Sequence, residues 1–225
     1  PISKSWDSWI EFEKEFQQKN IQELNKSEVS KDELITNKVL GGVSHAYHNK
    51  KRNKIYVAVN YPGKIPHLAE LDIESGKIKR LHDVKGPTLF NVTSLAYDEK
   101  NDLLFYTTDN DSKRDLNSFN LRTGKSKLLY KDCRIGDLAF NKVDESIWGV
   151  KHVNGISTLV KINKYNSENP NNQYTDWEQK YTLPFGNDMF DMDISPDGLN
   201  LSAAVTDLNG NQFLKIFEIN SFKSF

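Results

Sequence analysis

The chain has 225 residues and a formal net charge of −1, and 37% of its residues are hydrophobic and 11% aromatic. This length fits one all-β domain or one and a half ordinary domains. The balanced charge gives no basic surface for nucleic acid, and no apolar run approaches the roughly 18 residues of a membrane span. We therefore expect neither nucleic-acid binding nor membrane insertion. Cys133 is the one cysteine, so the chain cannot form an internal disulfide.

Residues 1–42 are predicted to be a helical N-terminal segment and a polar connector. Trp6, Trp9, Ile10 and Phe16 recur at helical spacing, which predicts an amphipathic helix over residues 1–20. Two explanations of its apolar stripe are open: packing on its own domain, or docking of an upstream domain of the same polypeptide on Trp6 and Trp9. The chain opens with Pro1 instead of methionine, which favours a processed or excised piece.

A repeat organises the rest of the chain. Residues 71–81, Leu-Asp-Ile-Glu-Ser-Gly-Lys-Ile-Lys-Arg-Leu, return as residues 119–129, Phe-Asn-Leu-Arg-Thr-Gly-Lys-Ser-Lys-Leu-Leu. Each copy predicts two strands joined by a tight turn, in which Gly76 or Gly124 supplies the positive φ that the turn requires.

Alternation of apolar and polar residues begins at Val43 and continues to Ile219. It falls into modules of up to four short strands that begin near residues 43, 92, 135 and 190. The spacing between successive module starts, together with the number of strands in each module, is typical of β-propeller blades. We predict an all-β fold over residues 43–225, a β-propeller of four-stranded antiparallel blades with three complete blades and a partial fourth. That fourth blade lacks its outer strand.

The missing strand leaves two possibilities. Residues 34–40 supply it and close a four-bladed ring, or the chain is one piece of a larger ring. Four-bladed rings are the uncommon size among propellers of roughly four to eight blades, which favours the larger ring.

Short motifs add a resemblance. Ala46-Tyr47, Ala96-Tyr97, Ala139-Phe140 and the segment 194–198, Ile-Ser-Pro-Asp-Gly, make the blades resemble the TolB-like (WD-like) propellers of bacteria. The full Ser-Pro-Asp-Gly occurs in the fourth blade alone. The resemblance implies a periplasmic or cell-envelope protein that binds partners, or the non-catalytic propeller of a larger peptidase-like protein. The sequence itself leaves the cytoplasm open as well.

No catalytic set can be assembled from the sequence. His45 and His48 are three apart, which places them on opposite faces of a strand. Ser44 lacks the closing glycine of a nucleophile elbow. The segment 207–218 mimics a calcium loop, but Gln212 stands where that loop needs glycine, and a hairpin turn around Asn209-Gly210 explains it better. We expect no catalytic residue, metal or cofactor in this chain.

Propeller geometry instead predicts a polar face. Loops from second to third strands lie at the same end as the starts of the inner strands, and loops on a rigid scaffold commonly carry binding residues. The predicted partner-binding residues are His45, Asp109, Arg114, Asp137, His152, Asp191 and Asp207. We expect Tyr61, Lys64, Thr93 and Asn154 to lie at the same end. Asp137 and Asp191 hold matching positions in successive inner strands, so their carboxylates should converge.

The sequence thus predicts a non-catalytic module that binds a protein or peptide through its polar loop face. The alternative is an accessory propeller of a larger peptidase-like enzyme, which gates or positions substrate.

Overall fold

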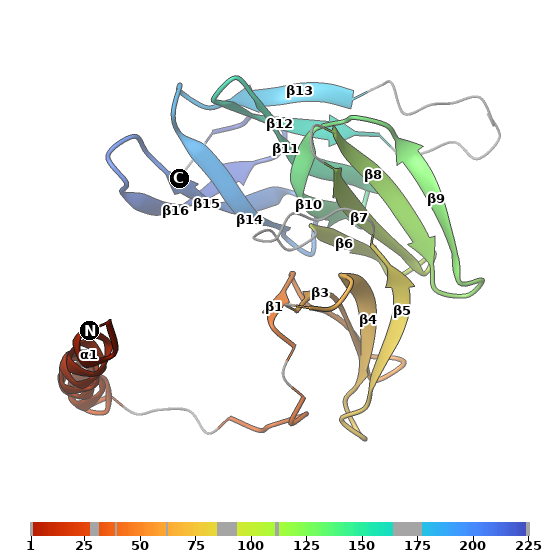
Figure 1. Ribbon diagram of the computed structural model, residues 1–225. Coiled ribbons are helices and arrows are strands. Elements are labelled where there is room, and N and C mark those ends of the chain that lie inside the picture. Colours follow the sequence, from red (N-terminus) through yellow and green to blue (C-terminus); the bar gives the residue numbers. More distant parts are fainter. Residues whose placement is uncertain are drawn as a thin grey trace. The chain divides into compact units, whose positions relative to one another are not determined.

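The structure is a computed structural model, which describes residues 2–27, 32–38, 40–61, 63–84, 94–110, 113–163 and 177–223. The chain forms two compact units, Pro1–Ile35 and Thr36–Phe225. The first is helical and the second is built of antiparallel sheets (Figure 1). The predicted all-β propeller with one N-terminal helix is confirmed.

The helical unit consists of α1 (Ile2–Leu24) and the residues that follow it. The tryptophans lie on successive turns, with the ring centroids of Trp6 and Trp9 5.1 Å apart. Both rings are exposed, Trp6 to 59% and Trp9 to 49%. The helix expected over residues 1–20 is therefore present and extends one turn further.

The second unit has four sheets, which form the blades of a four-blade propeller ring (Figure 1). Blade 1 consists of β1 (Gly42–Val43), β2 (Tyr47–Asn49), β3 (Lys54–Asn60), β4 (His67–Asp72) and β5 (Ile78–Asp83). Blade 2 consists of β6 (Leu95–Asp98), β7 (Leu103–Asn110), β8 (Lys113–Asn120) and β9 (Lys125–Tyr130). Blade 3 consists of β10 (Ile135–Asn141), β11 (Ser146–Val153), β12 (Ile156–Ile162) and β13 (Trp177–Thr182). Blade 4 consists of β14 (Asp188–Ile194), β15 (Asn200–Thr206) and β16 (Gln212–Glu218).

Within each blade the strands follow one another in chain order from the inner to the outer edge. In blade 1, β1 and β2 both pair with β3 and together make the inner strand. The described residues of blade 4 contain three strands, so the prediction of three complete blades and a partial fourth is confirmed.

The two repeat copies form the hairpins β4–β5 and β8–β9. Gly76 and Gly124 have φ values of 64° and 66°, in the left-handed region where a side chain is strained. Their amides donate to the carbonyls of Asp72 and Asn120 at 2.9 and 2.8 Å. The turns predicted from the repeat are therefore present, with glycine where the backbone needs it.

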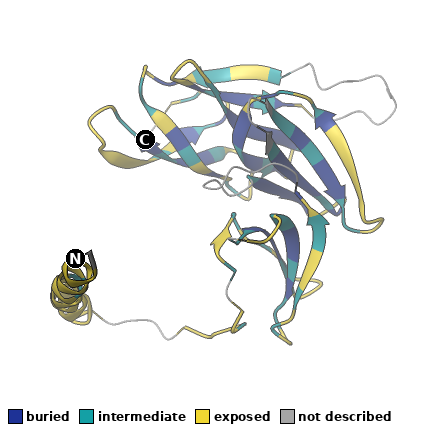
Figure 2. Ribbon diagram, in the orientation of Figure 1, coloured by how far each residue is buried: buried dark blue, intermediate teal, exposed yellow. Residues whose placement is uncertain are grey.

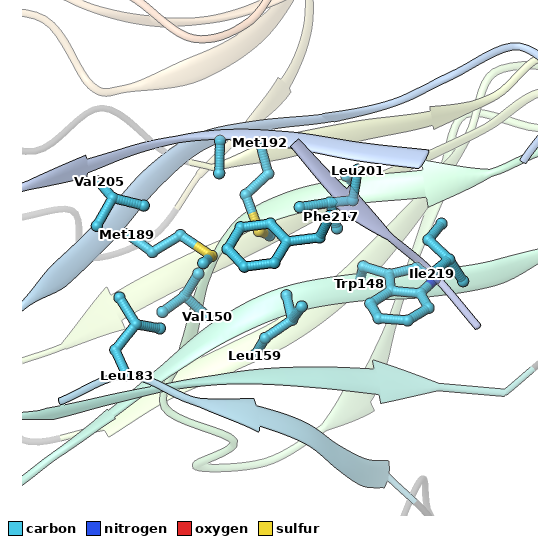
Figure 3. Close-up of a cluster of buried hydrophobic side chains, with 12 residues drawn as sticks. Trp148, Val150, Leu159, Leu183, Met189, Met192, Leu201, Val205, Phe217 and Ile219 are labelled. Atoms are coloured by element: carbon cyan, nitrogen blue, oxygen red, sulfur yellow. The ribbon is translucent and has the colours of Figure 1, made fainter. Parts of the chain in front are cut away.

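Apolar side chains pack between neighbouring blades, where the buried residues of Figure 2 are concentrated. Separate core clusters join blades 1 and 2, blades 2 and 3, and blades 3 and 4. In the last of these, side chains from β11 and β12 point toward those from β14, β15 and β16 (Figure 3). Trp148 lies in this cluster, fully buried between adjacent sheets.

The connector does not complete blade 4. Residues 32–38 and Leu40 form no strand. Leu40 packs against Val57, Val59 and Ala69 on blade 1. The alternative in which residues 34–40 supply the missing strand is therefore not what the structure shows.

Candidate functional site

The inner strands of blades 3 and 4 carry the same irregularity. The pairing of β10 with β11 shifts between Gly136 and Ala139, and that of β14 with β15 shifts between Phe190 and Asp193. Asp137 and Asp191 lie at these bulges with φ values of 47° and 52°. Aspartate is among the few residues with a side chain that adopt this region readily, and a bulge redirects its side chain.

Counting along the inner strands shows the equivalent positions in the other blades. Asp137 stands four residues before Asn141, at the end of its inner strand. The same count from Asn49 leads to His45, and from Asp98 to Ser94. His45, Ser94, Asp137 and Asp191 are therefore the corresponding residues of blades 1 to 4.

Two contacts join these positions across blades. Nε2 of His45 lies 3.3 Å from Oδ1 of Asp191, which connects blade 1 to blade 4. The amide of Leu138 donates to Oγ of Ser94 at 2.6 Å, which connects blade 3 to blade 2. Equivalent residues of four blades thus gather around the propeller axis.

Asp137 is half-buried and interacts electrostatically with residues of blades 2, 3 and 4. Burial raises the pKa of its carboxyl above the ordinary value. Among its charged neighbours, His152 and Arg114 lower this pKa, and Asp191 and Asp188 raise it. Arg114 reaches this region because Gly136 has no side chain: a Cβ there would lie 2.5 Å from Nη1 of Arg114. Carboxyls whose pKa is perturbed by burial and by specific charged neighbours are found preferentially at functional sites.

His152, Ser157 and Asp188 form a second group beside Asp137. Nδ1 of His152 lies 3.1 Å from Oγ of Ser157 and 3.5 Å from Oδ1 of Asp188. Ser157 also donates to Oδ1 of Asp188 at 2.9 Å. A catalytic triad needs the serine at one imidazole nitrogen and the carboxylate at the other. Here both meet Nδ1, and Ser157 is buried, so this group orients side chains and does not form a nucleophile.

We call the residues that meet at this end of the axis the axial cluster: His45, Arg114, Asp137, His152, Asp188 and Asp191. Three aspartates and one arginine give it a net charge of −2 when both histidines are neutral. Asp188 and Asp191 remain well exposed, at 56% and 68% of their side chains. The cluster can accept hydrogen bonds from a cationic group.

The other predicted residues make separate contacts or lie, in whole or in part, outside the described residues. Asp207 accepts hydrogen bonds from the amides of Asn209 and Asn211, at 2.8 and 2.9 Å, within its own hairpin turn. Asp109 is at the end of β7 opposite Arg114, and its side chain lies outside the described part of the chain. Lys64 lies over the ring of Tyr61, 4.9 Å from its centroid, Asn154 occupies the β11–β12 turn, and Thr93 lies outside the described residues.

Asp188 and Ser157 are not among the residues predicted from the sequence. Asp188 is three residues before Asp191, a spacing that places two side chains on opposite faces of a regular strand. The bulge at Asp191 breaks that alternation, and no residue pattern marks it in advance.

The opposite end of the blades also has a polar surface, a groove of ≈ 900 Å³ lined by the turns between first and second strands. Several of its charges pair with one another. Asp102 is buried and its Oδ2 accepts from Nη2 of Arg52 at 2.6 Å and from Nε of Arg122 at 2.5 Å. Lys100 pairs with Glu145 at 2.7 Å. The Asp102 pairs join blades 1 and 2, and the Lys100–Glu145 pair joins blades 2 and 3, so this network is best explained as part of the fold.

Among the described residues, no three histidine, cysteine, aspartate or glutamate side chains are placed to hold a metal ion. The described part of the chain also contains no helix with the length and apolarity to cross a bilayer.

No family model matches this sequence, and no curated protein matches it. Solved structures do match. TolB from Acinetobacter baumannii aligns over 82% of this chain and 43% of its own, with 12% identity and a TM-score of 0.63. A TolB-like protein from Agrobacterium tumefaciens aligns over 79% of this chain and 62% of its own, with 9% identity and a TM-score of 0.62. A prolyl endopeptidase aligns over 81% of this chain and 28% of its own, with 11% identity and a TM-score of 0.52.

The chain therefore spans less than two thirds of each of these proteins. At such identities the likeness concerns the fold alone. The resemblance seen in the sequence is confirmed at that level: the chain has the fold of the TolB-like β-propellers.

Proposed function

We propose that this chain is a non-catalytic propeller module that binds a protein or peptide partner, and that a basic side chain of the partner docks on the axial cluster. The observation that carries the proposal is the convergence of His45, Asp137 and Asp191 from different blades, with an excess of negative charge. Convergent polar groups on a rigid scaffold are the usual basis of a binding site.

The electrostatics of Asp137 support a binding role. Its raised pKa means that the carboxylate is less stable in the folded chain than in water, so the fold alone does not favour the charge. Arg114 and His152 offset part of this destabilisation of the carboxylate. An incoming guanidinium or ammonium group would stabilise the rest, because charge-assisted hydrogen bonds are stronger than neutral ones.

The second candidate is an accessory propeller of a larger peptidase-like enzyme, which gates or positions substrate. The structural likeness to a prolyl endopeptidase propeller supports it. The intact mass of the native polypeptide separates the candidates: a mass near 25.9 kDa supports a free-standing module, and a much larger one supports the accessory domain. The TolB-like fold supports the periplasm or cell envelope as the compartment.

Neutralising both bulge aspartates is expected to weaken binding of a cationic peptide by at least about tenfold, as expected for loss of two charge-assisted contacts. The variant is Asp137→Asn with Asp191→Asn, because asparagine tolerates the left-handed backbone of both positions. The probe is N-acetyl-Gly-Arg-Gly amide, titrated by NMR, with shift changes expected at residues 136–139 and 188–193.

Two controls accompany this titration. Glu74→Gln with Glu99→Gln removes the same charge from exposed positions and should leave binding unchanged. N-acetyl-Gly-Gln-Gly amide should cause no saturable shifts. Equal binding by the wild type and the Asp137/Asp191 variant, or early thermal unfolding of that variant, would show that the axial cluster is only architectural.

A further inference from the structure

Two histidines of the axial cluster each lie against an aspartate of β14. Nε2 of His45 is 3.3 Å from Oδ1 of Asp191, and Nδ1 of His152 is 3.5 Å from Oδ1 of Asp188. Both aspartates are well exposed, whereas Asp137 is half-buried. The carboxylates that are most accessible to a cationic ligand are therefore the ones that face the histidines.

The charge of a histidine depends on the surrounding pH. It is the side chain whose ordinary titration falls between pH 5 and pH 8. A neutral imidazole has one N–H donor and one bare nitrogen, and a protonated imidazole has two N–H donors and a positive charge. Protonation of the two histidines would therefore place a cation of the chain itself beside each of these aspartates.

This protonation changes the charge of the whole axial cluster by two. With neutral imidazoles, its three aspartates and Arg114 give it a net charge of −2. With both imidazoles protonated, the same residues carry no net charge. The excess of negative charge that favours a basic ligand is then lost.

The surroundings of His152 bring further charged groups into this balance. Asp137 of β10 interacts electrostatically with it, and Arg114 of β8 interacts with the same carboxyl. Ser157 of β12 lies 3.1 Å from Nδ1 and also donates to Asp188. Carboxylates thus act on this imidazole from two strands, β10 and β14.

The remaining charged groups nearby have partners of their own or act on a neighbouring residue. The amide of His152 donates to the carbonyl of Arg134 at 3.4 Å, and the guanidinium of Arg134 pairs with Asp132 at 3.4 Å. Asp193 of β14 acts electrostatically on Tyr47, two residues after the other histidine. Carboxylates are therefore the groups that both imidazoles meet.

We propose that His45 and His152 make binding at the axial cluster depend on pH, so that a basic side chain binds when both imidazoles are neutral and is released when they are protonated. This inference rests on the binding role proposed above. A protonated imidazole occupies a carboxylate that the ligand needs and repels the cation of the ligand. Protons and ligand thus compete for the same aspartates, and each lowers the affinity for the other.

The test is an NMR titration with N-acetyl-Gly-Arg-Gly amide at pH 7.5 and at pH 5.5, at constant ionic strength. Arginine stays protonated at both pH values, so the charge of the probe does not change. The dissociation constant is expected to rise at least about tenfold at the lower pH, because two positive charges appear within a few ångströms of the bound cation.

The variant is His45→Gln with His152→Asn, in which neither side chain titrates and an amide nitrogen can take the place of Nε2 or Nδ1. Its readout is the ratio of the dissociation constants at the two pH values. This ratio should fall below about threefold, with the rest due to protonation of Asp137. His48→Gln is the matched control: this exposed histidine lines the groove at the opposite end of the blades, and its loss should leave the wild-type ratio unchanged.

The outcomes separate this proposal from the binding role on which it rests. Saturable binding with equal affinity at both pH values overturns the pH dependence and leaves the binding role intact. A wild-type ratio that persists in the double histidine variant also overturns it, because Asp137 is then the group that titrates. Absence of saturable binding at pH 7.5 overturns the binding role and this regulation together. The single variants, each expected to lose part of the ratio, keep the test valid if the double variant does not fold.

Discussion

Replacing Trp148 with alanine is expected to lower the free energy of unfolding of the propeller by about 3–5 kcal/mol, the range for large-to-small changes at well-packed aromatic positions. Trp148 is fully buried between blades 3 and 4, and its Nε1 donates to Oγ of Ser146 at 2.9 Å. Phe222 also contacts it, with ring centroids 6.0 Å apart. Truncation leaves a cavity against two sheets that are fixed by their own ladders, so the site cannot collapse around it.

Chemical denaturation of the wild type and Trp148→Ala measures this change. Trp6→Ala is the matched control, because this exposed tryptophan belongs to the helical unit and its loss should leave propeller stability nearly unchanged. A loss below about 1 kcal/mol for Trp148→Ala would mean that the ring is not buried between blades.

Replacing Asp102 with asparagine is expected to cost about 2–3 kcal/mol. This is below the usual loss for breaking a buried ion pair, because Arg52 and Arg122 remain partly exposed to solvent. The Asp102 carboxylate holds one arginine from each of blades 1 and 2, so its loss weakens their junction. Asparagine keeps the shape and tolerates the φ of 56° at this position, which isolates the effect of charge.

The pH dependence of this loss follows from the pKa of Asp102. Burial alone would raise that pKa, but hydrogen bonds from Arg122 and Arg52 outweigh burial and hold it below the ordinary value. A lowered pKa in the folded state contributes stability above the pKa of the unfolded chain, and this stability is lost as pH falls through the folded value. The difference in the free energy of unfolding between wild type and Asp102→Asn should therefore have its full value at pH 7 and become smaller as the pH falls. A difference that is constant between pH 7 and pH 3 would contradict the charge pairing.

The repeat and the strands were readable from the sequence because they depend on local chemistry. Alternating side chains mark half-buried strands, and Gly76 and Gly124 mark turns that need positive φ. The equivalence of Asp137 and Asp191 was also accessible, since it follows from their matching positions in two inner strands. These features involve neighbours in the chain or a simple count of residues.

Features that depend on the folded backbone or on distant contacts could not be predicted from the sequence in this way. Asp207 was expected at the binding face, but its carboxylate caps its own turn, which is a competing role for any aspartate near a glycine. Asp188 joins the axial cluster because a bulge interrupts β14. Asp102 holds arginines 50 and 20 residues away, and the charged residues around it look the same in sequence as solvated ones.

The claim that residues of different blades meet at the axis is tested most directly by NMR titration of the Asp137 carboxyl. Its pKa is expected above the ordinary value of aspartate, because the group is half-buried and lies near other carboxylates. Asp191→Asn should lower this pKa by removing a negative neighbour, and Arg114→Gln should raise it by removing a positive one. The carboxyl of Asp197, at the β14–β15 turn, serves as the reference and should not respond. An ordinary pKa for Asp137 that neither substitution changes would contradict the convergence and the binding role built on it.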